Sequence, residues 1–499
     1  MAAEIQIQFS DDLVRYFAAL SHDCNPLHMN AQYARRTPFG SIVVHGVAAV
    51  LKILGRHFGG EPFQLESISA LFKKPLQVGI SYDLTFTEEN KRVHARVSRG
   101  AEVCLDLRFG YIPWRRGQDS RAWDVSGFHP LPAASECSWD SDIPGGSSRS
   151  YSLAPSELDG LERFFGLRAS QLPLQQLSAL CWSSYFVGME CPGRDALFLR
   201  LDCDFDTPAV SSPAIELRNL AVGRDARFRL VRIDGAGTDI RRFALQALHR
   251  PTMLSWPIAD LRRELAAGPS WAGKNVFISG ATRGFGLVLA KCLALRGANI
   301  ATTFRHPGPE VDELISDLRT TGSHHRVLQA DLENLAAFQQ AASELTTGSG
   351  GFECVVHNAF PHIGQRAFAD QSPDAMLEYM HSGVRLAVNA LKTLVPLMKE
   401  NGHVVHISSL FSVKPEPRFS HYAATKSAVE GLFRGVSVEN PTLRFMNFRP
   451  PRMLTDQTNI PMVGFKTVSP AWVANRLIEA LEGSDSPGIR ELTIESMVD

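Results

Sequence analysis

The sequence predicts an α+β fold over its first half and an α/β fold over its second half. In roughly the first 250 residues, a helical segment is twice followed by runs that alternate apolar and polar residues, as half-buried antiparallel strands do. After residue 271, short β-rich runs alternate with helical segments, which is the pattern of a doubly wound parallel sheet. A chain of 499 residues is long enough for roughly two to four such domains.

Two breaks rich in glycine, proline and small polar residues divide the chain. One includes Pro144-Gly145-Gly146-Ser147-Ser148, and the other lies around 251–273. We therefore expect a first domain at 1–115, a linker at 116–150, a second domain at 151–255 and a C-terminal domain at 271–499.

The hydrophobic period identifies the individual elements. The predicted helices before the C-terminal domain are Ser41–Phe58, Leu172–Gly188 and a connecting helix, Ile258–Ala267. The predicted antiparallel strands are Ser81–Phe86, Val93–Val97 and Val103–Ile112 in the first domain, and 197–205, 215–221, 226–232 and 239–247 in the second. The predicted parallel strands are Asn275–Ser279, Asn299–Thr303, Val327–Ala330, Cys354–His357, His403–Ile407 and Arg444–Phe448.

Composition excludes several classes of function. The net charge of -1 provides no field that would attract nucleic acid or an anionic membrane. No apolar run reaches the roughly 18 residues of a membrane helix, and the first residues lack a secretory signal. The eight cysteines are scattered without metal-ligand spacing. We expect a cytoplasmic protein with no metal, no nucleic-acid partner and no membrane partner.

A carboxylate and an imidazole flank an Asn-Pro turn near the N-terminus. Asp23 and His28 are five residues apart, so they cannot share a helical face, but Pro26 forces a turn that can bring them together. Water addition across an enoyl double bond needs a base and an acid, and Asn25 could orient the water. The residues alone leave open which of Asp23 and His28 is the acid.

This segment resembles the (R)-specific enoyl hydratases and dehydratases of the MaoC type, which have the hot-dog fold. Asp23, Asn25 and His28 match the family's catalytic segment, and His22 stands where the family usually has glycine. Phe39 and His45-Gly46 match a downstream motif, where a helix N-terminus helps to polarise the thioester carbonyl. The resemblance covers about 110 residues and implies a double hot-dog over the first half.

The second domain lacks the catalytic pair. Ser170-Gln171-Leu172-Pro173 precedes its helix, with neither Asp nor His, although Pro192–Leu197 resembles the turn after a hot-dog helix. We interpret it as a degenerate second hot-dog that buries the open face of the first and shapes the acyl tunnel. The alternative is an unrelated small domain.

A glycine-rich turn lies between a predicted strand and a predicted helix, which is the context of a dinucleotide-binding loop. Its glycines permit a tight turn and close approach of the backbone to a pyrophosphate. The second strand ends without an acid, so Arg305 would suit a 2′-phosphate and predicts NADPH; the alternative is a solvated charge. The predicted contacts of the loop are Gly280, Thr282, Arg283, Gly284, Phe285 and Gly286.

Tyr422 and Lys426 are four residues apart on a predicted helix and so share a face. An ammonium beside a phenol lowers the phenol's pKa, and Ser409 would bond the same carbonyl oxygen. This pattern resembles the short-chain dehydrogenase/reductase family, which has a Rossmann fold, over roughly 271–499. The resemblance places Asp331, Leu332, Asn358, Ala359, Tyr422 and Lys426 at the cofactor.

Three positions depart from that family. Phe360 replaces a glycine, Pro450-Pro451 replaces Pro-Gly, and the asparagine of the central helix is missing, with Ser382-Gly383 in its region and His381 and Asn389 nearby. A broken asparagine–lysine–water relay would slow proton delivery.

Together the motifs predict a bifunctional enzyme on acyl thioesters. NADPH would reduce a 3-ketoacyl thioester, and dehydration would give a trans-2-enoyl thioester, as in fatty-acid or polyketide-type biosynthesis. The alternatives are the reverse, NAD-dependent degradation of acyl-CoA, or one active domain with the other as a docking module. We expect substrates on CoA or an acyl carrier protein, and a homodimer formed through the reductase domains.

Overall fold

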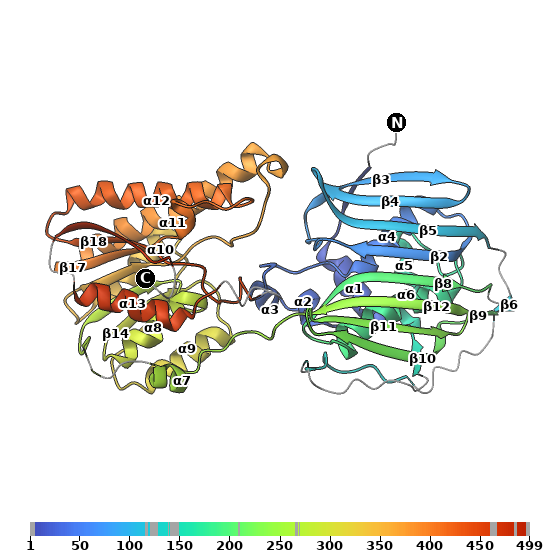
Figure 1. The fold of residues 1–499 in the computed structure, drawn as a ribbon, viewed down its shortest axis with the longest axis horizontal. Helices are drawn as coiled ribbons and strands as arrows, with labels where there is room; N and C mark the ends of the chain where they lie inside the picture. Colours follow the sequence, from blue (N-terminus) through green and yellow to red (C-terminus); the bar gives the residue numbers. More distant parts are fainter. Residues whose placement is uncertain are drawn as a thin grey trace. The chain divides into compact units, whose positions relative to one another are not determined.

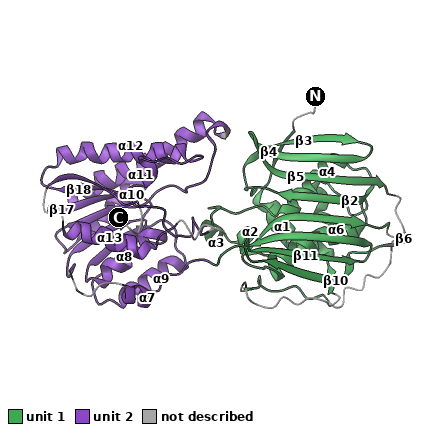
Figure 2. Cartoon of the chain, viewed as in Figure 1, with its two compact units in different colours: residues 1–252, 460–462 green, residues 253–459, 463–499 purple. Residues whose placement is uncertain are grey.

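The computed structural model divides the chain into two compact units, residues 1–252 with 460–462, and residues 253–459 with 463–499 (Figure 2). The structure describes residues 5–114, 118–119, 128–137, 139, 149–207, 210–264, 268, 270–459, 467–483 and 487–495. Most of the predicted linker, 116–150, lies outside the described residues. Among the described helices, none is long and apolar enough to cross a membrane.

The N-terminal unit is built on one ten-stranded sheet in the order β1-β3-β4-β5-β2-β8-β12-β11-β10-β7 (Figure 1). The first half contains β1 (Ile5–Gln8), α1 (Asp11–Ser21), α2 (Pro26–Met29), α3 (Ala31–Arg35), α4 (Gly46–Phe58), β2 (Phe63–Phe72), β3 (Ser81–Glu89), β4 (Arg92–Arg99) and β5 (Glu102–Pro113). The second half contains β7 (Arg149–Ser152), α5 (Leu161–Phe165), α6 (Leu174–Tyr185), a π-helical turn (Phe186–Glu190), β8 (Ala196–Phe205), β10 (Ala214–Asp225), β11 (Leu230–Gly237) and β12 (Ile240–His249). A short pair, β6 (Gln118–Asp119) and β9 (Val210–Ser211), lies apart from this sheet.

The two halves have the same topology. Each half has its first strand at an outer edge of the sheet, its long helix over the sheet and its second strand at the centre. The two central strands, β2 and β8, pair antiparallel, with Ser67–Leu71 of β2 hydrogen-bonded to Arg200–Asp204 of β8. One continuous apolar core runs through both halves. The predicted double hot-dog is therefore confirmed, with its two copies joined edge to edge.

Several predicted boundaries of this unit were wrong. Strand β2 was not predicted, because a bulge between Leu65 and Ser67 breaks the alternation that identifies a strand. The helix expected from Ser41 begins only at Gly46. The strand expected at 226–232 begins at Leu230, since residues 226–229 form a turn.

The C-terminal unit has a seven-stranded parallel sheet in the order β15-β14-β13-β16-β17-β18-β19, which confirms the predicted doubly wound fold. Its strands are β13 (Asn275–Ser279), β14 (Asn299–Phe304), β15 (Arg326–Gln329), β16 (Phe352–His357), β17 (Met398–Ile407), β18 (Arg444–Arg449) and β19 (Gly488–Thr493). Its helices are α7 (Ile258–Glu264), α8 (Gly284–Leu295), α9 (Pro309–Arg319), α10 (Leu335–Thr346), α11 (Pro373–Leu394), α12 (Ser420–Glu439) and α13 (Pro470–Glu482).

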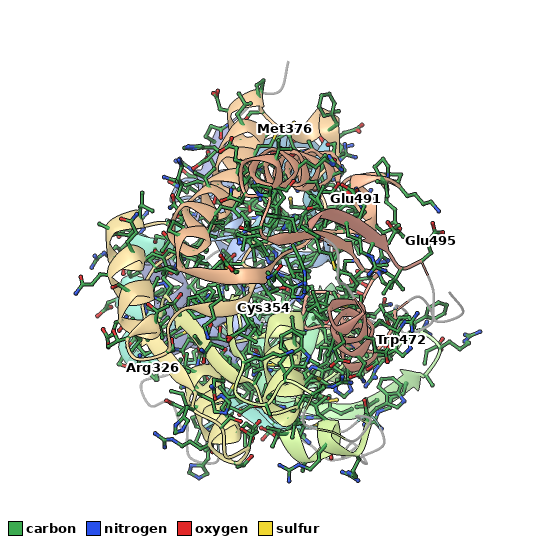
Figure 3. The ribbon with its side chains drawn as sticks, turned by 90° about the vertical axis from the view of Figure 1, so that its left-hand side faces the viewer. Arg326, Cys354, Met376, Trp472, Glu491 and Glu495 are labelled. Atoms are coloured by element: carbon green, nitrogen blue, oxygen red, sulfur yellow. The ribbon has the colours of Figure 1, made fainter. Side chains whose placement is uncertain are left out.

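Helices cover both faces of this sheet, and Cys354 of the central strand β16 is fully buried between them (Figure 3). The strand order reverses between β13 and β16, whose last residues Ser279 and His357 are paired in register. In doubly wound sheets the ligand crevice lies beyond the carboxyl ends of the strands at this switch point. The glycine-rich turn follows Ser279 directly, so the fold places it at that crevice.

Candidate active sites

The first site begins where helix α1 ends. His22 adopts a left-handed backbone (φ 60°), a conformation in which glycine is favoured, and this explains the glycine common at that position in the family it resembles. The turn carries Asp23 inward, where it is 1% exposed. Its carboxylate accepts hydrogen bonds from the Ser184 hydroxyl (2.7 Å) and from the backbone N–H of Asn25 (3.2 Å).

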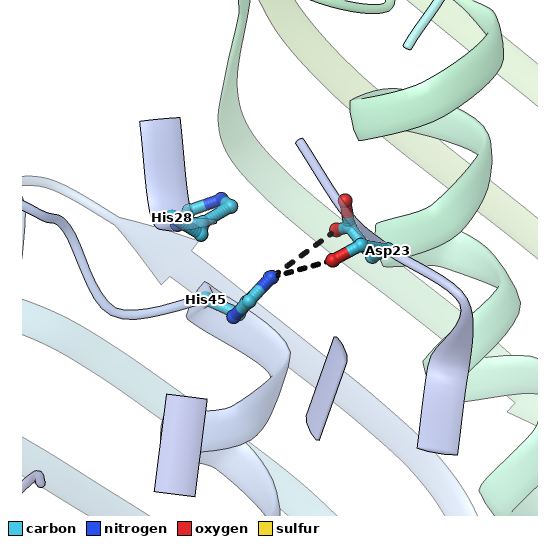
Figure 4. A group of neighbouring side chains, drawn as sticks. All are labelled: Asp23, His28 and His45. Atoms are coloured by element: carbon cyan, nitrogen blue, oxygen red, sulfur yellow. Dashed lines mark hydrogen bonds and ion pairs between the residues drawn. The ribbon is translucent and has the colours of Figure 1, made fainter. Parts of the chain in front are cut away.

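His28 lies opposite Asp23. Its Nδ1 is 2.6 Å from the carbonyl oxygen of Val43, which can only accept, so Nδ1 carries the proton and Nε2 has a free lone pair when the ring is neutral. The ring stacks on His45 with 3.8 Å between centroids. One carboxylate oxygen of Asp23, one ring nitrogen of His28 and one ring nitrogen of His45 all lie within 4.8 Å of one another (Figure 4). The predicted pair therefore comes together, with His45 beside it.

His45 supports the pair from the N-terminus of α4. Its Nε2 donates to the backbone carbonyl of Asp23 at 3.0 Å, and Phe17 packs against the ring at 4.8 Å. Within the described part of the chain, its Nδ1 has no hydrogen-bond partner. Because Nε2, the nitrogen nearest to Asp23, carries a proton that is donated to a backbone carbonyl, it is poorly suited to bind a metal ion. His45 instead stabilises the turn that carries Asp23.

Asn25 has a different role from the one predicted. Its Oδ1 accepts from the N–H of Leu27 and caps α2, and its Nδ2 donates to the carbonyls of Gly188 (2.6 Å) and Gly193 (3.1 Å). The side chain is 2% exposed. Both amide hydrogens are used, so Asn25 clamps the catalytic turn to the second repeat instead of orienting water.

Burial inverts the usual order of the two pKa values. Burial raises the pKa of Asp23 to about 7, although the hydrogen bonds from Ser184 and Asn25 oppose the change. Burial lowers the pKa of His28 to about 4, with the hydrogen bond to Val43 opposing and the charge of Arg250 assisting. At a pH between these two pKa values, the pair of Asp23 and His28 therefore holds one proton in total, and that proton resides mainly on Asp23.

The second site begins at the glycine-rich turn. Gly280 has a positive φ of 70°, and a Cβ on Gly286 would lie 2.3 Å from the carbonyl oxygen of Gly280. The Ser279 hydroxyl accepts from the N–H groups of Asn358 and Ala359, both at 3.0 Å, and fixes the neighbouring loop. The glycine-rich turn has no room for a side chain at Gly286 and leads into the N-terminus of α8. Backbone N–H groups there can bind the pyrophosphate of a dinucleotide.

The remaining predicted cofactor residues fall into three groups. The side chains of Phe285 and Leu332 are 6% and 7% exposed and belong to the apolar core, so these residues can offer only their backbone to a cofactor. Arg305 lies at the exposed end of β14, where its Nε is 3.9 Å from a carboxylate oxygen of Asp331. Thr282 and Arg283 lie in the turn itself, between β13 and α8.

The catalytic group lies at the start of α12. Burial raises the pKa of Tyr422 to about 12, opposed by a hydrogen bond with Ser409. Burial lowers the pKa of Lys426 to about 7, and its ammonium donates to the carbonyl of Ile407 at 2.6 Å. The predicted lowering of the phenol's pKa was wrong, because burial outweighs an ammonium that lies 5.9 Å from the Tyr422 ring centroid.

The aromatic ring of Phe360 packs against the side-chain nitrogen of Lys426. The Phe360 ring lies 3.9 Å from its Nζ and meets the Tyr422 ring edge to face at 5.4 Å. A Cβ on Gly383 of α11 would lie 2.5 Å from Thr425 and 3.3 Å from Phe360. The missing asparagine therefore leaves no gap, since Thr425 and Phe360 fill the space beside Gly383.

A buried ion pair that the sequence did not reveal holds this site. Glu430 accepts hydrogen bonds from Ser408 (2.5 Å), Ser412 (2.7 Å) and the guanidinium of Arg449 (2.5 and 2.8 Å). Ser408 precedes Ser409, and Glu430 lies one turn beyond Lys426 on α12. The network ties the serine loop, the catalytic helix and β18 together.

Known proteins resemble the two units separately. Residues 1–103 match the family described as MaoC like domain, and residues 274–460 match short chain dehydrogenase. The chain therefore combines a MaoC-like domain with a short-chain dehydrogenase domain, which confirms both resemblances inferred from the motifs. As members of these families the two domains are a hydratase/dehydratase and an oxidoreductase.

Curated relatives align with about a third of the chain. The fatty acyl-CoA reductase of Acinetobacter baylyi is 27% identical over 173 residues, 34% of this chain and 57% of the relative. The 3-ketodihydrosphingosine reductase of Bacteroides thetaiotaomicron is 26% identical over 166 residues, 33% of this chain and 57% of the relative. The chain thus spans little more than half the length of either relative. A short-chain dehydrogenase from Burkholderia cenocepacia, solved in complex with NADP, has 22% identity and a TM-score of 0.41, and the match covers 45% of this chain and 98% of that one.

Proposed function

We propose that this chain is a bifunctional enzyme that reduces a 3-ketoacyl thioester with NADPH and dehydrates the resulting 3-hydroxyacyl thioester to a trans-2-enoyl thioester. The observation that carries the proposal is the one-proton pair of Asp23 and His28, in a chain that also has a serine–tyrosine–lysine site beside a dinucleotide loop. The first group eliminates water and the second reduces a carbonyl. The two steps are consecutive on a lengthening acyl chain.

The ionisation of the first site suits dehydration. The free lone pair of His28 Nε2 takes the proton from the α-carbon, the C–O bond at the β-carbon breaks, and Asp23 gives its proton to the departing hydroxyl, which leaves as water. Proton transfer from His28 to Asp23 restores the starting state. The N-terminus of α4, which begins at Gly46, presents backbone N–H groups to the thioester carbonyl. Hydration uses the same one-proton state in reverse.

The ionisation of the second site suits reduction. The cofactor supplies a hydride to the keto carbon when it is bound. Tyr422 holds its proton at neutral pH because its pKa is about 12, so it can give that proton to the carbonyl oxygen, with Ser409 bonding the same oxygen. An ammonium on Lys426 stabilises the phenolate that remains. Oxidation would require the phenolate at the start, which this environment disfavours.

Three further assignments belong to the proposal. Arg305 would bind the 2′-phosphate and select NADPH, and the names of the two aligned relatives, both reductases, support the direction of reduction. The substrate would be carried on CoA or an acyl carrier protein, in fatty-acid or polyketide-type biosynthesis. The chain would form a homodimer through its dehydrogenase domains.

A second candidate follows from Phe360. Its ring covers the Lys426 ammonium at 3.9 Å in the region where the family has glycine. In this candidate, the C-terminal unit binds nucleotide but turns over no substrate, and the chain is a dehydratase with a regulatory or docking domain.

Separate assays of the two half-reactions test the proposal. Purified protein should hydrate a trans-2-enoyl-CoA, followed as loss of enoyl absorbance, and should oxidise NADPH in the presence of a 3-ketoacyl thioester. Hydration without NADPH oxidation, despite measurable binding of NADPH, would support the second candidate. Absence of hydration across enoyl substrates from four to sixteen carbons would contradict both.

A further inference from the structure

The helix of the second repeat reaches the catalytic carboxylate of the first. Ser184, near the end of α6, donates its hydroxyl hydrogen to Oδ2 of Asp23 at 2.7 Å. Gly188, one turn later, lies so close that a Cβ there would be 2.5 Å from Oδ1. Both residues come from the copy that has no catalytic pair of its own, and both lie against the Asp23 carboxylate.

Other parts of the second repeat hold the same turn. The carbonyls of Gly188 and Gly193 accept from the amide of Asn25, two residues after Asp23. The hydroxyl of Tyr151 in β7 donates to the carbonyl of Ser21, two residues before it, at 3.0 Å. The turn that carries Asp23 is therefore held by the second repeat on both of its sides.

The hydroxyl of Ser184 also acts on the charge of Asp23. A hydroxyl that donates to a carboxylate stabilises the charged form, and this effect is strong where water is excluded. Asp23 is 1% exposed and Ser184 is 5% exposed, so bulk solvent does not weaken this hydrogen bond. Without this donor, Asp23 would keep its proton to a higher pH.

We propose that Ser184 is a positioning residue of the dehydration reaction, and that the second repeat thereby forms half of the active site. Its hydroxyl bonds Oδ2 and so fixes the orientation of the Asp23 carboxylate opposite His28, and it keeps Asp23 acidic enough to release its proton. The absence of a catalytic pair in the second repeat reflects this supporting role. The inference rests on the dehydratase function proposed above.

The pH profile of enoyl-CoA hydration, measured on the full chain, tests the inference. In the wild type, kcat falls above the pKa of Asp23, about 7, as the pair loses its last proton. Ser184→Ala should move this alkaline limb up by about one pH unit and lower kcat roughly tenfold, as expected for the loss of a hydrogen bond to a charged group. KM should change less, because Ser184 does not contact the acyl chain in this account.

Ser183→Ala is the matched control. Ser183 is the preceding residue on α6, is 1% exposed and donates its hydroxyl to the carbonyl of Leu180 at 2.6 Å, so its loss removes a buried hydroxyl without touching Asp23. Its limb should stay at the wild-type pH. Ser184→Thr, which keeps a hydroxyl, should also keep the limb in place; this comparison still applies if the alanine variant does not fold.

An alkaline limb that stays in place in Ser184→Ala, or moves equally in Ser184→Ala and Ser184→Thr, would overturn the role of Ser184 while leaving the dehydratase function intact. Failure of the proposed function would look different. In that case the wild type would not hydrate enoyl-CoA, or Asp23→Asn would hydrate it as fast as the wild type.

Discussion

Hydrogen bonds orient both catalytic groups of the N-terminal site, whereas the lysine of the C-terminal site has a carbonyl and an aromatic ring as its neighbours. Asp23 is bonded to Ser184, and His28 is bonded to Val43, so both members of the pair are oriented before any ligand arrives. In the C-terminal unit, Lys426 donates to the carbonyl of Ile407 and is otherwise covered by the Phe360 ring. Burial shifts the pKa values at both sites: it brings the pKa of Asp23 and that of Lys426 to about 7, whereas it raises the pKa of Tyr422 to about 12.

Burial has a different consequence at each site. At the first, it raises the pKa of an acid and lowers that of a base until a single proton is shared. At the second, it keeps Tyr422 protonated and makes the charge of Lys426 costly. Burial therefore makes the first site share one proton between an acid and a base, and makes the second site retain the proton of its tyrosine.

The sharpest separation of the two sites is a reciprocal pair of variants. Asp23→Asn should lower enoyl-CoA hydration by about 10³-fold and leave NADPH oxidation within about twofold, and Tyr422→Phe should do the opposite, since each change removes one proton-transfer group. The two half-reactions are measured on each variant. A variant that lost both activities while remaining folded by circular dichroism would contradict the independence of the sites.

The hydrogen-bond network of Glu430, which holds the second site, can be removed by one substitution. Glu430→Ala removes one of the two carboxylates that pair with the guanidinium of Arg449, which keeps Glu491, and should destabilise the C-terminal unit by about 2 kcal/mol. Hydrogen exchange should rise in α12 and β18 and stay unchanged in α6. Glu479→Ala, which removes an exposed partner of Arg476, is the control and should cost below about 1 kcal/mol. Equal effects in both variants would argue against the network.

Arg305 sharpens the account of the cofactor. Arg305→Ala should raise the Kd for NADPH roughly tenfold and leave the Kd for NADH unchanged, because a guanidinium–phosphate bond would be lost only with NADPH. Titration of nucleotide fluorescence measures both values, and Arg319→Ala on α9 is the control. A parallel loss of affinity for both nucleotides would indicate a general effect on the loop and would remove the basis for NADPH preference.

Phe360 gives the smallest effect, and its direction is opposite to that of Ser184→Ala. The ring stabilises the ammonium of Lys426, so Phe360→Leu should lower the pKa of that lysine below about 7. Reduction requires the ammonium, so its alkaline limb should move down by about half a pH unit. Phe411→Leu is the control, since Phe411 lies 6.0 Å from the Tyr422 ring. A limb that moved up would contradict a stabilising contact.

Local patterns predicted the fold and indicated candidate residues for both sites, because alternation, glycine-rich turns and short spacings are local properties. They could not predict partners from distant segments. Ser184 is 161 residues from Asp23, and Glu430 and Arg449 meet only because α12 packs on β18. Such contacts are decided by which faces of the two repeats and of the sheet are buried together.

Burial itself was the second limit. The spacing of Tyr422 and Lys426 predicted a lowered phenol pKa, and the depth of the site reversed its direction. The departure at Phe360 was visible in the sequence, but its contact with Lys426 and Gly383 was not. The spacing of residues on a helix predicts which side chains are neighbours, but it does not predict how deeply those side chains are buried.

To learn whether both sites work on one acyl chain, the purified protein is incubated with a 3-ketoacyl thioester and NADPH while nucleotide absorbance and product mass are followed together. We expect NADPH consumption and a product lighter by one water than the 3-hydroxyacyl thioester. Consumption that stops at the hydroxyacyl thioester, in protein that fails to hydrate the matching enoyl thioester, would contradict this expectation.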